Sequence, residues 1–171
     1  AQADLGILWA LGKGGKRDFA QAREWFLKAA RWGNTDAMFN LGIIYIFGHG
    51  VDEDPNQGRG WMVMAADKGH PGAMCSLGLI HGLGQKVPQD FHLARQWYTK
   101  AAELGFGPGH FYLGLMDARG QGGDKDLIKA LMHFSLAQML GDNRGAGTMA
   151  QLEKELSASE VAKAARMAKK W

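Results

Sequence analysis

Apolar residues recur along this chain at steps of three and four, which is the spacing of one face of an α-helix. The stretch after Asp18 shows the pattern clearly, with Ala22, Trp25, Phe26 and Ala29 on one helical face. Similar stretches, separated by glycine-containing turns, follow one another to the end of the chain. The pattern predicts ten helices, at about residues 3–12, 19–32, 35–47, 55–68, 71–83, 91–104, 107–119, 127–140, 143–155 and 158–170.

The helical pattern returns every 36 residues without insertion or deletion. One position of the repeat holds Trp25, Trp61 and Trp97, and His133 stands at the fourth place. A Leu-Gly pair marks the other helix of each unit, at 5–6, 41–42, 77–78 and 113–114. A glycine inside a helix costs about 1 kcal/mol relative to alanine. Its regular return suggests that a neighbouring helix approaches too closely for a Cβ atom.

Two further sets of recurring residues mark where the helices begin and end. An aspartate is a favourable N-cap, and the repeat places one before the tryptophan-bearing helix each time, at positions 18, 54, 90 and 126. Pro55 follows at the first helical position, which suits proline. Gly33 and its equivalents at 69, 105 and 141 fit a left-handed C-terminal cap. Each unit is therefore predicted to be a helical hairpin.

One such hairpin cannot bury its apolar face alone, whereas stacked hairpins can. We therefore expect an all-α fold, a right-handed α-solenoid (α/α superhelix) of about five hairpins, in a single domain over residues 1–171. Ser157 and Glu160 have the spacing of a capping box at the start of the last helix. The expected repeats span about 1–34, 35–70, 71–106 and 107–142, followed by a partial repeat and C-terminal capping helix over 143–171.

Composition narrows the class of protein. The 171 residues are 46% hydrophobic and 22% charged, which is too apolar for intrinsic disorder. No apolar run approaches the roughly 20 residues of a membrane helix, so we expect no membrane insertion. A single cysteine excludes an internal disulfide framework. The net charge of +3 comes from scattered basic residues, so we expect no nucleic-acid partner.

The motifs that would carry catalysis or metal binding are incomplete. The sequence Asp52-x-Asp54-x-Asn56 resembles the start of a calcium loop, but Val63 stands where the closing glutamate belongs. The six histidines include no pair at the H-x-x-x-H spacing of a metal site. We therefore predict no catalytic residue, no metal and no cofactor.

Two polar features and the cysteine could carry some chemistry nonetheless. His81 and Asp117 occupy equivalent places on consecutive helices, where we expect a structural hydrogen bond, with a proton-relay or metal role as the alternative. Cys75 has apolar neighbours and no obvious activating cation, so we expect a buried, inert thiol.

The order of motifs within each repeat is specific. A Leu-Gly pair is followed by an aromatic residue, a Gly-x-Gly-Val turn (GHGV at 48–51), an aspartate and a segment such as WYTKAA at 97–102. Over residues 1–141 these motifs resemble the Sel-one-like repeat (SLR) family, a relative of tetratricopeptide repeats. Departures from the family pattern are His81 and Asp117 at the aromatic position and His133 at the tryptophan position.

The resemblance implies a non-enzymatic scaffold or adaptor for protein–protein interaction, commonly bacterial, whose concave groove is lined by the first helix of each hairpin. We expect this groove to bind an apolar peptide or helix of a protein partner. In groove-binding relatives, an asparagine at the place of Asn40 holds the peptide backbone. The expected partner-binding residues are Phe39, Asn40, Ile43, Ile46, Phe47, Cys75, Ser76, Leu79, Phe111, Tyr112 and Leu115.

Two other functions stay open at this point. Some relatives are linked to cell-wall or β-lactam-type compounds, so the alternative is a hydrolase or ligand-binding protein acting on these compounds, although the sequence shows no nucleophile–base pair. A third function is that of a structural subunit whose groove is permanently filled. The bacterial periplasm and cytoplasm both fit the sequence, and the oligomeric state is open. The first helix begins in mid-motif at Leu5-Gly6, as it would after a removed leader or further repeats.

Overall fold

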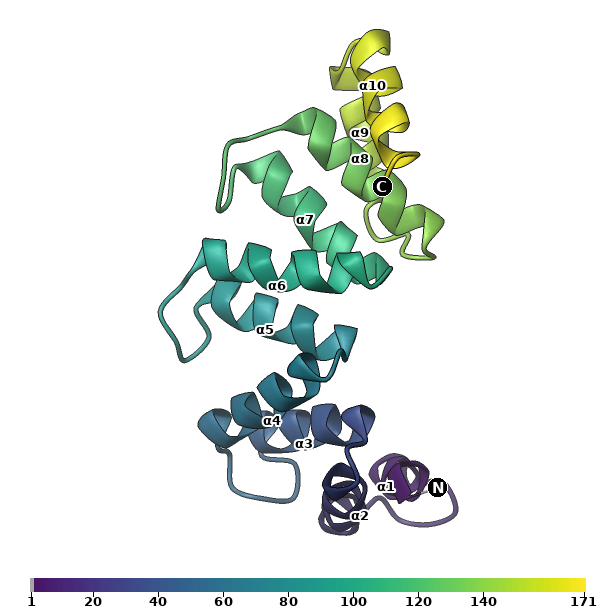
Figure 1. Ribbon diagram of the computed structural model, residues 1–171. Helices are drawn as coiled ribbons and strands as arrows, with labels where there is room; N and C mark the ends of the chain where they lie inside the picture. The colour runs from purple at the N-terminus through teal and green to yellow at the C-terminus, as the bar shows by residue number, and fades with distance from the viewer. Residues whose placement is uncertain (1) are drawn as a thin grey trace. The chain divides into compact units, whose positions relative to one another are not determined.

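The computed structural model describes residues 2–171, and over that range the regular elements are ten α-helices, with no strand (Figure 1). Residue 1, at which the predicted domain and its first repeat begin, lies outside the described residues. The all-helical prediction is confirmed. The helices are α1 (Gln2–Leu11), α2 (Phe19–Arg31), α3 (Thr35–Phe47), α4 (Pro55–Asp67), α5 (Pro71–Leu83), α6 (Phe91–Glu103), α7 (Gly107–Arg119), α8 (Leu127–Met139), α9 (Ala146–Glu155) and α10 (Ala158–Ala168).

The largest difference from the predicted bounds lies at α9, which begins at Ala146 instead of residue 143. Gly145 is its N-cap and supplies no side chain to cap the helix. The preceding residues are engaged elsewhere, because Asp142 accepts a hydrogen bond from the backbone N–H of Arg144 and forms an ion pair with its guanidinium. The chain therefore turns here before the helix starts.

The helices form two compact units, one ending at Leu77 and one beginning at Gly78, so the boundary falls inside α5. In the first unit α1 packs on α2, α2 on α3 and α3 on α4. In the second unit α6 packs on α7, α7 on α8, and α8 on both α9 and α10. Within each unit, successive hairpins thus share a helix–helix interface, as expected of a repeat array.

The predicted helix starts are confirmed by side-chain hydrogen bonds. Asp18 Oδ1 accepts from the backbone N–H of Gln21 at 3.0 Å, and the aspartates at 54, 90 and 126 do the same in their own repeats. Pro55 stands in the first turn of α4. Ser157 and Glu160 form the predicted capping box at the start of α10. Each such cap satisfies a backbone donor that the helix leaves unpaired.

The glycine of the Leu-Gly pair lies where two helices of one hairpin meet. A Cβ atom on Gly78 would stand 2.5 Å from Cε1 of Tyr98. The equivalent glycines meet the equivalent side chains, Phe26, Met62 and Phe134, at 2.5 to 2.9 Å. The close approach predicted from the sequence is therefore confirmed, and the crowding atoms belong to the residue that follows the repeat tryptophan.

At the turns, glycine is required by the backbone conformation and not by crowding from neighbouring atoms. Gly33 has φ of +80°, and a Cβ atom there would meet no heavy atom within 4 Å. Its equivalents at 69, 105 and 141 have the same features. Left-handed backbone is the reason for glycine at the end of each hairpin.

The repeat tryptophans are half-buried, and the core is formed by their neighbours. Phe26 and Phe134, each next to the tryptophan position, are buried to 1% exposure. Lys28 and Lys100 lie over the tryptophan rings one turn earlier, with Nζ 4.3 Å from the ring centroid in both cases. Burying a large apolar side chain contributes about 1.5–3 kcal/mol, and a partly exposed cation–π pair about 0.5–1 kcal/mol. Trp25 and Trp97 are therefore partly exposed side chains that pack under lysines of the same helix.

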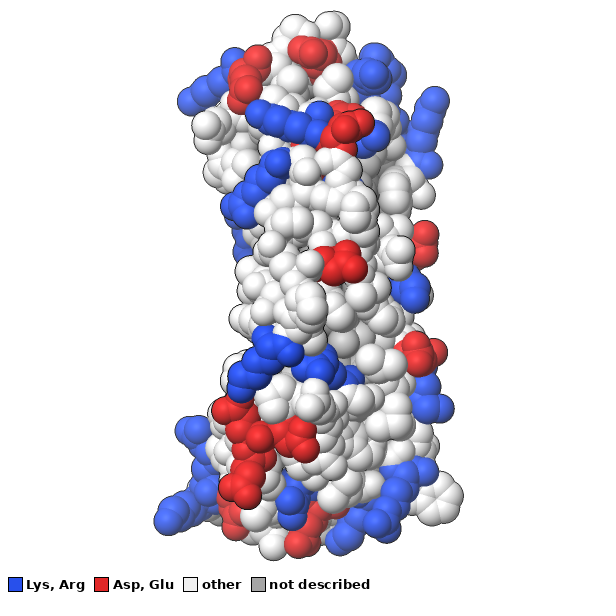
Figure 2. Space-filling view, turned by 90° about the vertical axis from the view of Figure 1, so that its left-hand side faces the viewer, with Lys and Arg blue, Asp and Glu red and all other residues white. Residues whose placement is uncertain are grey.

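The last helix is part of the second unit's core. Ala164 and Ala168 of α10 belong to the same buried cluster as Leu131 and Phe134 of α8. Among residues 2–171, no helix is both long and apolar enough to cross a membrane. On the face shown in Figure 2, Lys and Arg are interspersed with Asp and Glu, with uncharged surface between them.

Candidate functional site

The predicted partner-binding residues come from α3, α5 and α7 and differ in how much of each side chain reaches solvent. Phe47 is the most exposed, at 63%, whereas Cys75 is only 6% exposed and offers little surface to a partner. The remaining nine are half-buried: Phe39, Asn40, Ile43, Ile46, Ser76, Leu79, Phe111, Tyr112 and Leu115.

In the first unit, two predicted residues already contact their neighbours. The ring of Phe39 stacks on that of His70, with 4.7 Å between the ring centroids. Asn40 Nδ2 donates a hydrogen bond to the backbone carbonyl of Asp36 at 2.7 Å. This bond uses one amide hydrogen, so the second hydrogen and the carbonyl oxygen of Asn40 are left for other partners.

In the second unit, the structure brings Leu79, Tyr112 and Leu115 together around one pocket of about 240 Å³. These three residues, predicted separately on α5 and α7, share its lining. The volume lies below the roughly 300–1,000 Å³ of small-molecule sites. The pocket is therefore smaller than a typical small-molecule site. It is completed by Gly82, Leu83, Phe91, Ala94, Tyr98, Met116, Arg119 and Gln121.

Gly82 leaves room for this pocket. A Cβ atom at Gly82 would meet Ala94 Cβ at 3.4 Å, an ordinary contact, so the backbone here is not crowded. One repeat earlier Ile46 holds the same place, and its Cγ1 lies 2.6 Å from where a Cβ of Gly58 would stand. Ile46 thus fills the space between α3 and α4, whereas the corresponding space beside α6 is open.

The wall formed by Tyr112 is held in place from two sides. Its ring stacks on Tyr98 with 4.7 Å between centroids, and its hydroxyl accepts a hydrogen bond from Arg144 at 3.3 Å. The Arg144 guanidinium lies 4.3 Å from the ring centroid of Phe111 and is paired with Asp142. These contacts orient an aromatic wall before any ligand arrives, which reduces the entropy lost on binding.

The pKa shifts of Asp142 and Arg144 agree with the ion pair that the two side chains form. Hydrogen bonding to Arg144 lowers the pKa of the Asp142 carboxyl, and the same bond raises the pKa of the Arg144 guanidinium. Both groups are therefore charged at neutral pH.

Phe111 packs toward Phe134, at 6.1 Å between ring centroids, and is one of the half-buried side chains against the core. In the structure it supports the Tyr112 wall and does not line the pocket.

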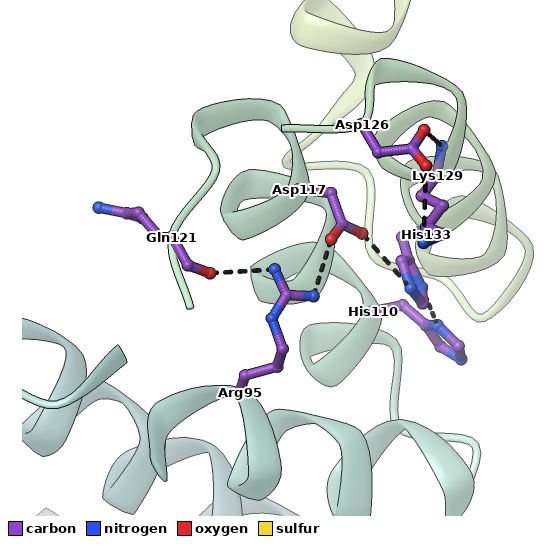
Figure 3. Close-up of polar contacts among 7 residues, drawn as sticks. All are labelled: Arg95, His110, Asp117, Gln121, Asp126, Lys129 and His133. Atoms are coloured by element: carbon purple, nitrogen blue, oxygen red, sulfur yellow. Dashed lines mark hydrogen bonds and ion pairs between the residues drawn. The ribbon is translucent and has the colours of Figure 1, made fainter. Parts of the chain in front are cut away.

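A buried polar cluster lies next to the pocket and crosses three helices (Figure 3). Arg95 of α6 donates to Asp117 Oδ1 of α7 at 2.7 Å and to the carbonyl oxygen of Gln121 at 3.0 Å. His133 of α8 places Nε2 3.7 Å from the other oxygen of Asp117, and its Nδ1 lies 3.0 Å from Nδ1 of His110. Through the bond to Gln121, Arg95 holds the loop that borders the pocket.

Burial controls the protonation of this cluster. It lowers the pKa of His133 to about 3, with further lowering from His110, Arg95 and Lys129. Burial also lowers the pKa of His110, and it raises that of Asp117 despite the opposing bond from Arg95. Both imidazoles are therefore neutral at pH 7, so one Nδ1 donates to the other.

The cluster differs from the sequence prediction in its partners. Asp117 forms an ion pair with Arg95, and its other oxygen lies 3.7 Å from Nε2 of the neutral His133, whereas the sequence paired Asp117 with His81. Two of the departures from the repeat pattern, Asp117 and His133, thus contact each other across α7 and α8. Neither imidazole lines the pocket, and Trp171 lies edge-on against both rings at 5.2 and 5.4 Å. We interpret the cluster as a structural link between α6, α7 and α8.

No group of three or more His, Cys, Asp or Glu side chains in the described range could hold a metal ion. Sequence reasoning missed Gly82, Leu83, Tyr98 and Arg119 as lining residues. Two of them could have been found by aligning the repeats. Gly82 stands at the position of Ile46 in the preceding repeat, and Arg119 stands at the position of Leu83.

A comparison with models of protein families matches the Sel1 repeat at residues 1–34, 35–70, 71–106 and 107–142. The chain belongs to the Sel1 repeat family. Proteins of the Sel1 repeat family commonly serve as protein–protein interaction scaffolds and are typically non-catalytic. A comparison with curated proteins finds no match.

Solved structures of bacterial Sel1 repeat proteins share the fold. One of them is c5321, a protective antigen of uropathogenic Escherichia coli with an SLR fold. The two proteins are 33% identical over 88% of the present chain, with a TM-score of 0.81. The present chain spans only 32% of that protein. A Sel1 repeat protein from Oxalobacter formigenes is 29% identical, with 99% of this chain and 71% of that one covered and a TM-score of 0.85.

Helicobacter pylori cysteine rich protein B shares the fold at lower similarity, with 22% identity, 77% of this chain and 95% of that one covered, and a TM-score of 0.61. The neighbours confirm the helical-repeat architecture expected from the sequence and suggest a bacterial source.

Proposed function

We propose that this Sel1 repeat chain is a non-enzymatic adaptor that binds an apolar segment of a protein partner, with an anchor side chain in the pocket between α5, α6 and α7. The observation that carries the proposal is the space left by Gly82 beside the stacked pair Tyr98 and Tyr112. Aromatic and aliphatic anchors in preformed pockets supply most of the affinity in such interfaces.

Exposed apolar residues at equivalent places in the repeat support an interaction surface. Leu11, Phe47 and Leu83 each end the first helix of their hairpin and are 57%, 63% and 61% exposed. Of these three, Leu83 lines the pocket itself, where an apolar patch on a soluble protein marks an interaction site. We propose the residues predicted on α3 as a separate binding surface of the first unit, and we propose that residues 1–171 form one repeat domain.

The proposal is tested by filling the pocket. Random peptides displayed on phage are selected against the wild-type chain, Gly82→Leu and Gly82→Ala. Leucine at this position would occupy the space that Ile46 fills one repeat earlier, whereas a lone Cβ fits at ordinary contact distance. We expect wild type and Gly82→Ala to enrich peptides with a large apolar anchor, and Gly82→Leu to lose them.

The circular dichroism spectrum of each variant establishes that the helices are intact before selection. If Gly82→Leu enriches the same peptides as wild type, or if wild type enriches none, the pocket is not the binding site and the proposal fails.

A further inference from the structure

We infer that the partner segment carries an acidic side chain, aspartate or glutamate, next to its apolar anchor, and that Arg119 at the edge of the pocket pairs with it. This inference rests on the proposed function and specifies the chemistry of the ligand. It adds a charge requirement to a pocket whose other walls are mostly apolar.

Arg119 is placed and available to make this pair. It lines the pocket and is exposed, and its side chain makes no hydrogen bond or ion pair with any residue in the range 2–171. The other arginine nearby, Arg95, is already paired with Asp117 at 2.7 Å. Arg119 is therefore the cation at this pocket whose charge is left for a ligand.

The repeat register shows that the charge is particular to this place. The last residue of the first helix is apolar in the three preceding hairpins, at Leu11, Phe47 and Leu83, and becomes Arg119 only in α7. The same pocket therefore has the apolar Leu83 from α5 and the cationic Arg119 from α7. A ligand that matches both needs an apolar group and a carboxylate close together in its sequence.

Gln121 supports the same arrangement. Arg95 binds its backbone carbonyl oxygen, as Figure 3 shows, and Gln121 also lines the pocket. Gln121 has a side-chain amide with both donor and acceptor groups. An amide of this kind can bind the backbone of a peptide whose side chains contact Leu83 and Arg119.

The size of the expected effect follows from the exposure of Arg119. Ion pairs at exposed sites change binding by about two- to fivefold, because water screens the charges. The apolar anchor therefore sets most of the affinity, and Arg119 selects among anchored peptides.

The test uses the phage selection with Arg119→Glu and the charge-matched control Arg166→Glu, which changes an exposed arginine on α10. We expect wild type and Arg166→Glu to enrich aspartate or glutamate near the anchor, and Arg119→Glu to enrich lysine or arginine there. A synthetic peptide from the wild-type pool should lose about two- to fivefold in affinity when its acid is changed to the amide. The same peptide change should have no effect on binding to Arg119→Gln.

The two proposals fail in different ways. This inference is overturned if the wild-type chain selects anchored peptides that depend on Gly82 but carry no preferred acidic residue. It is also overturned if Arg119→Glu selects the same acidic residues as the wild type. Either result leaves the proposed function standing. Absence of anchored peptides on the wild-type chain would overturn both. Arg119→Gln carries the test if Arg119→Glu does not keep the helical spectrum of the wild type.

Discussion

Replacing each of two glycines of α5 by alanine separates the effect of crowding on stability from the effect of helix propensity. Gly78 and Gly82 are one turn apart on α5 and face α6. A Cβ on Gly78 would lie 2.5 Å from Tyr98 Cε1, well inside the carbon–carbon contact distance of about 3.5–4.0 Å. Tyr98 is 4% exposed and stacks on Tyr112, so its ring has little room to move. A Cβ on Gly82 meets Ala94 Cβ at 3.4 Å.

The expected free energies follow from these contacts. Replacing a helix-interior glycine by alanine stabilises the helix by about 0.5–1 kcal/mol through propensity alone. Overpacking a well-packed site costs about 1–3 kcal/mol. We therefore expect Gly82→Ala to raise the free energy of unfolding by about 0.5–1 kcal/mol. Gly78→Ala should lie about 1–3 kcal/mol below Gly82→Ala, because the propensity gain is common to both.

Thermal unfolding followed by circular dichroism measures this difference directly. For a chain of this length, 1 kcal/mol shifts Tm by about 2–4 °C, so the two variants should differ by about 2–12 °C. Equal shifts in Tm for both variants would refute the conclusion that close approach of Tyr98 is what requires glycine at position 78. No other repeat has an equivalent pair, because Ala10, Ile46 and Ala118 stand at the place of Gly82.

The buried polar cluster yields two further predictions. Asp117→Ala removes the carboxylate that lies between Arg95 and His133. It should lower the free energy of unfolding by about 2–4 kcal/mol, measured by urea denaturation. Asp117→Asn keeps an acceptor for Arg95 and should lower the free energy of unfolding by a smaller amount. Since the pKa of His133 is lowered to about 3, the unfolded chain binds more protons than the folded chain below pH 6.5. Stability should therefore fall as pH is lowered from 6.5, by about 2 kcal/mol at pH 5, while the raised pKa of Asp117 opposes this loss at lower pH. Urea midpoints at pH 7 and pH 5 test this dependence. His133→Gln should reduce the loss of stability in acid, while His110, whose pKa burial also lowers, keeps its own contribution. An undiminished acid loss in that variant would assign it to other groups.

Much of the local structure followed from the repeat itself. The 36-residue register predicted all ten helices to within three residues at either end, the aspartate caps and the left-handed glycine turns. These features depend on interactions within one or two turns of chain, such as Asp18 with Gln21, so the nearby sequence is enough to specify them.

The candidate site was accessible from the sequence only in part. The sequence predicts Leu79, Tyr112 and Leu115 as binding residues because their positions lie beside the Leu-Gly pair, but nothing in the pattern shows that they share one pocket. Gly82 and Arg119 were passed over, since a glycine or arginine in a helix has many explanations until its neighbours are known.

The sequence alone determined the class of fold, the helix bounds and the family, because short-range periodicity and capping recur four times and reinforce one another. The tertiary structure decided which departures from the repeat meet. His133 lies next to Asp117, which forms an ion pair with Arg95, and the missing side chain of Gly82 leaves a pocket because Tyr98 and Tyr112 stack beside it. Such outcomes depend on distances between residues on different helices, which a linear pattern does not contain.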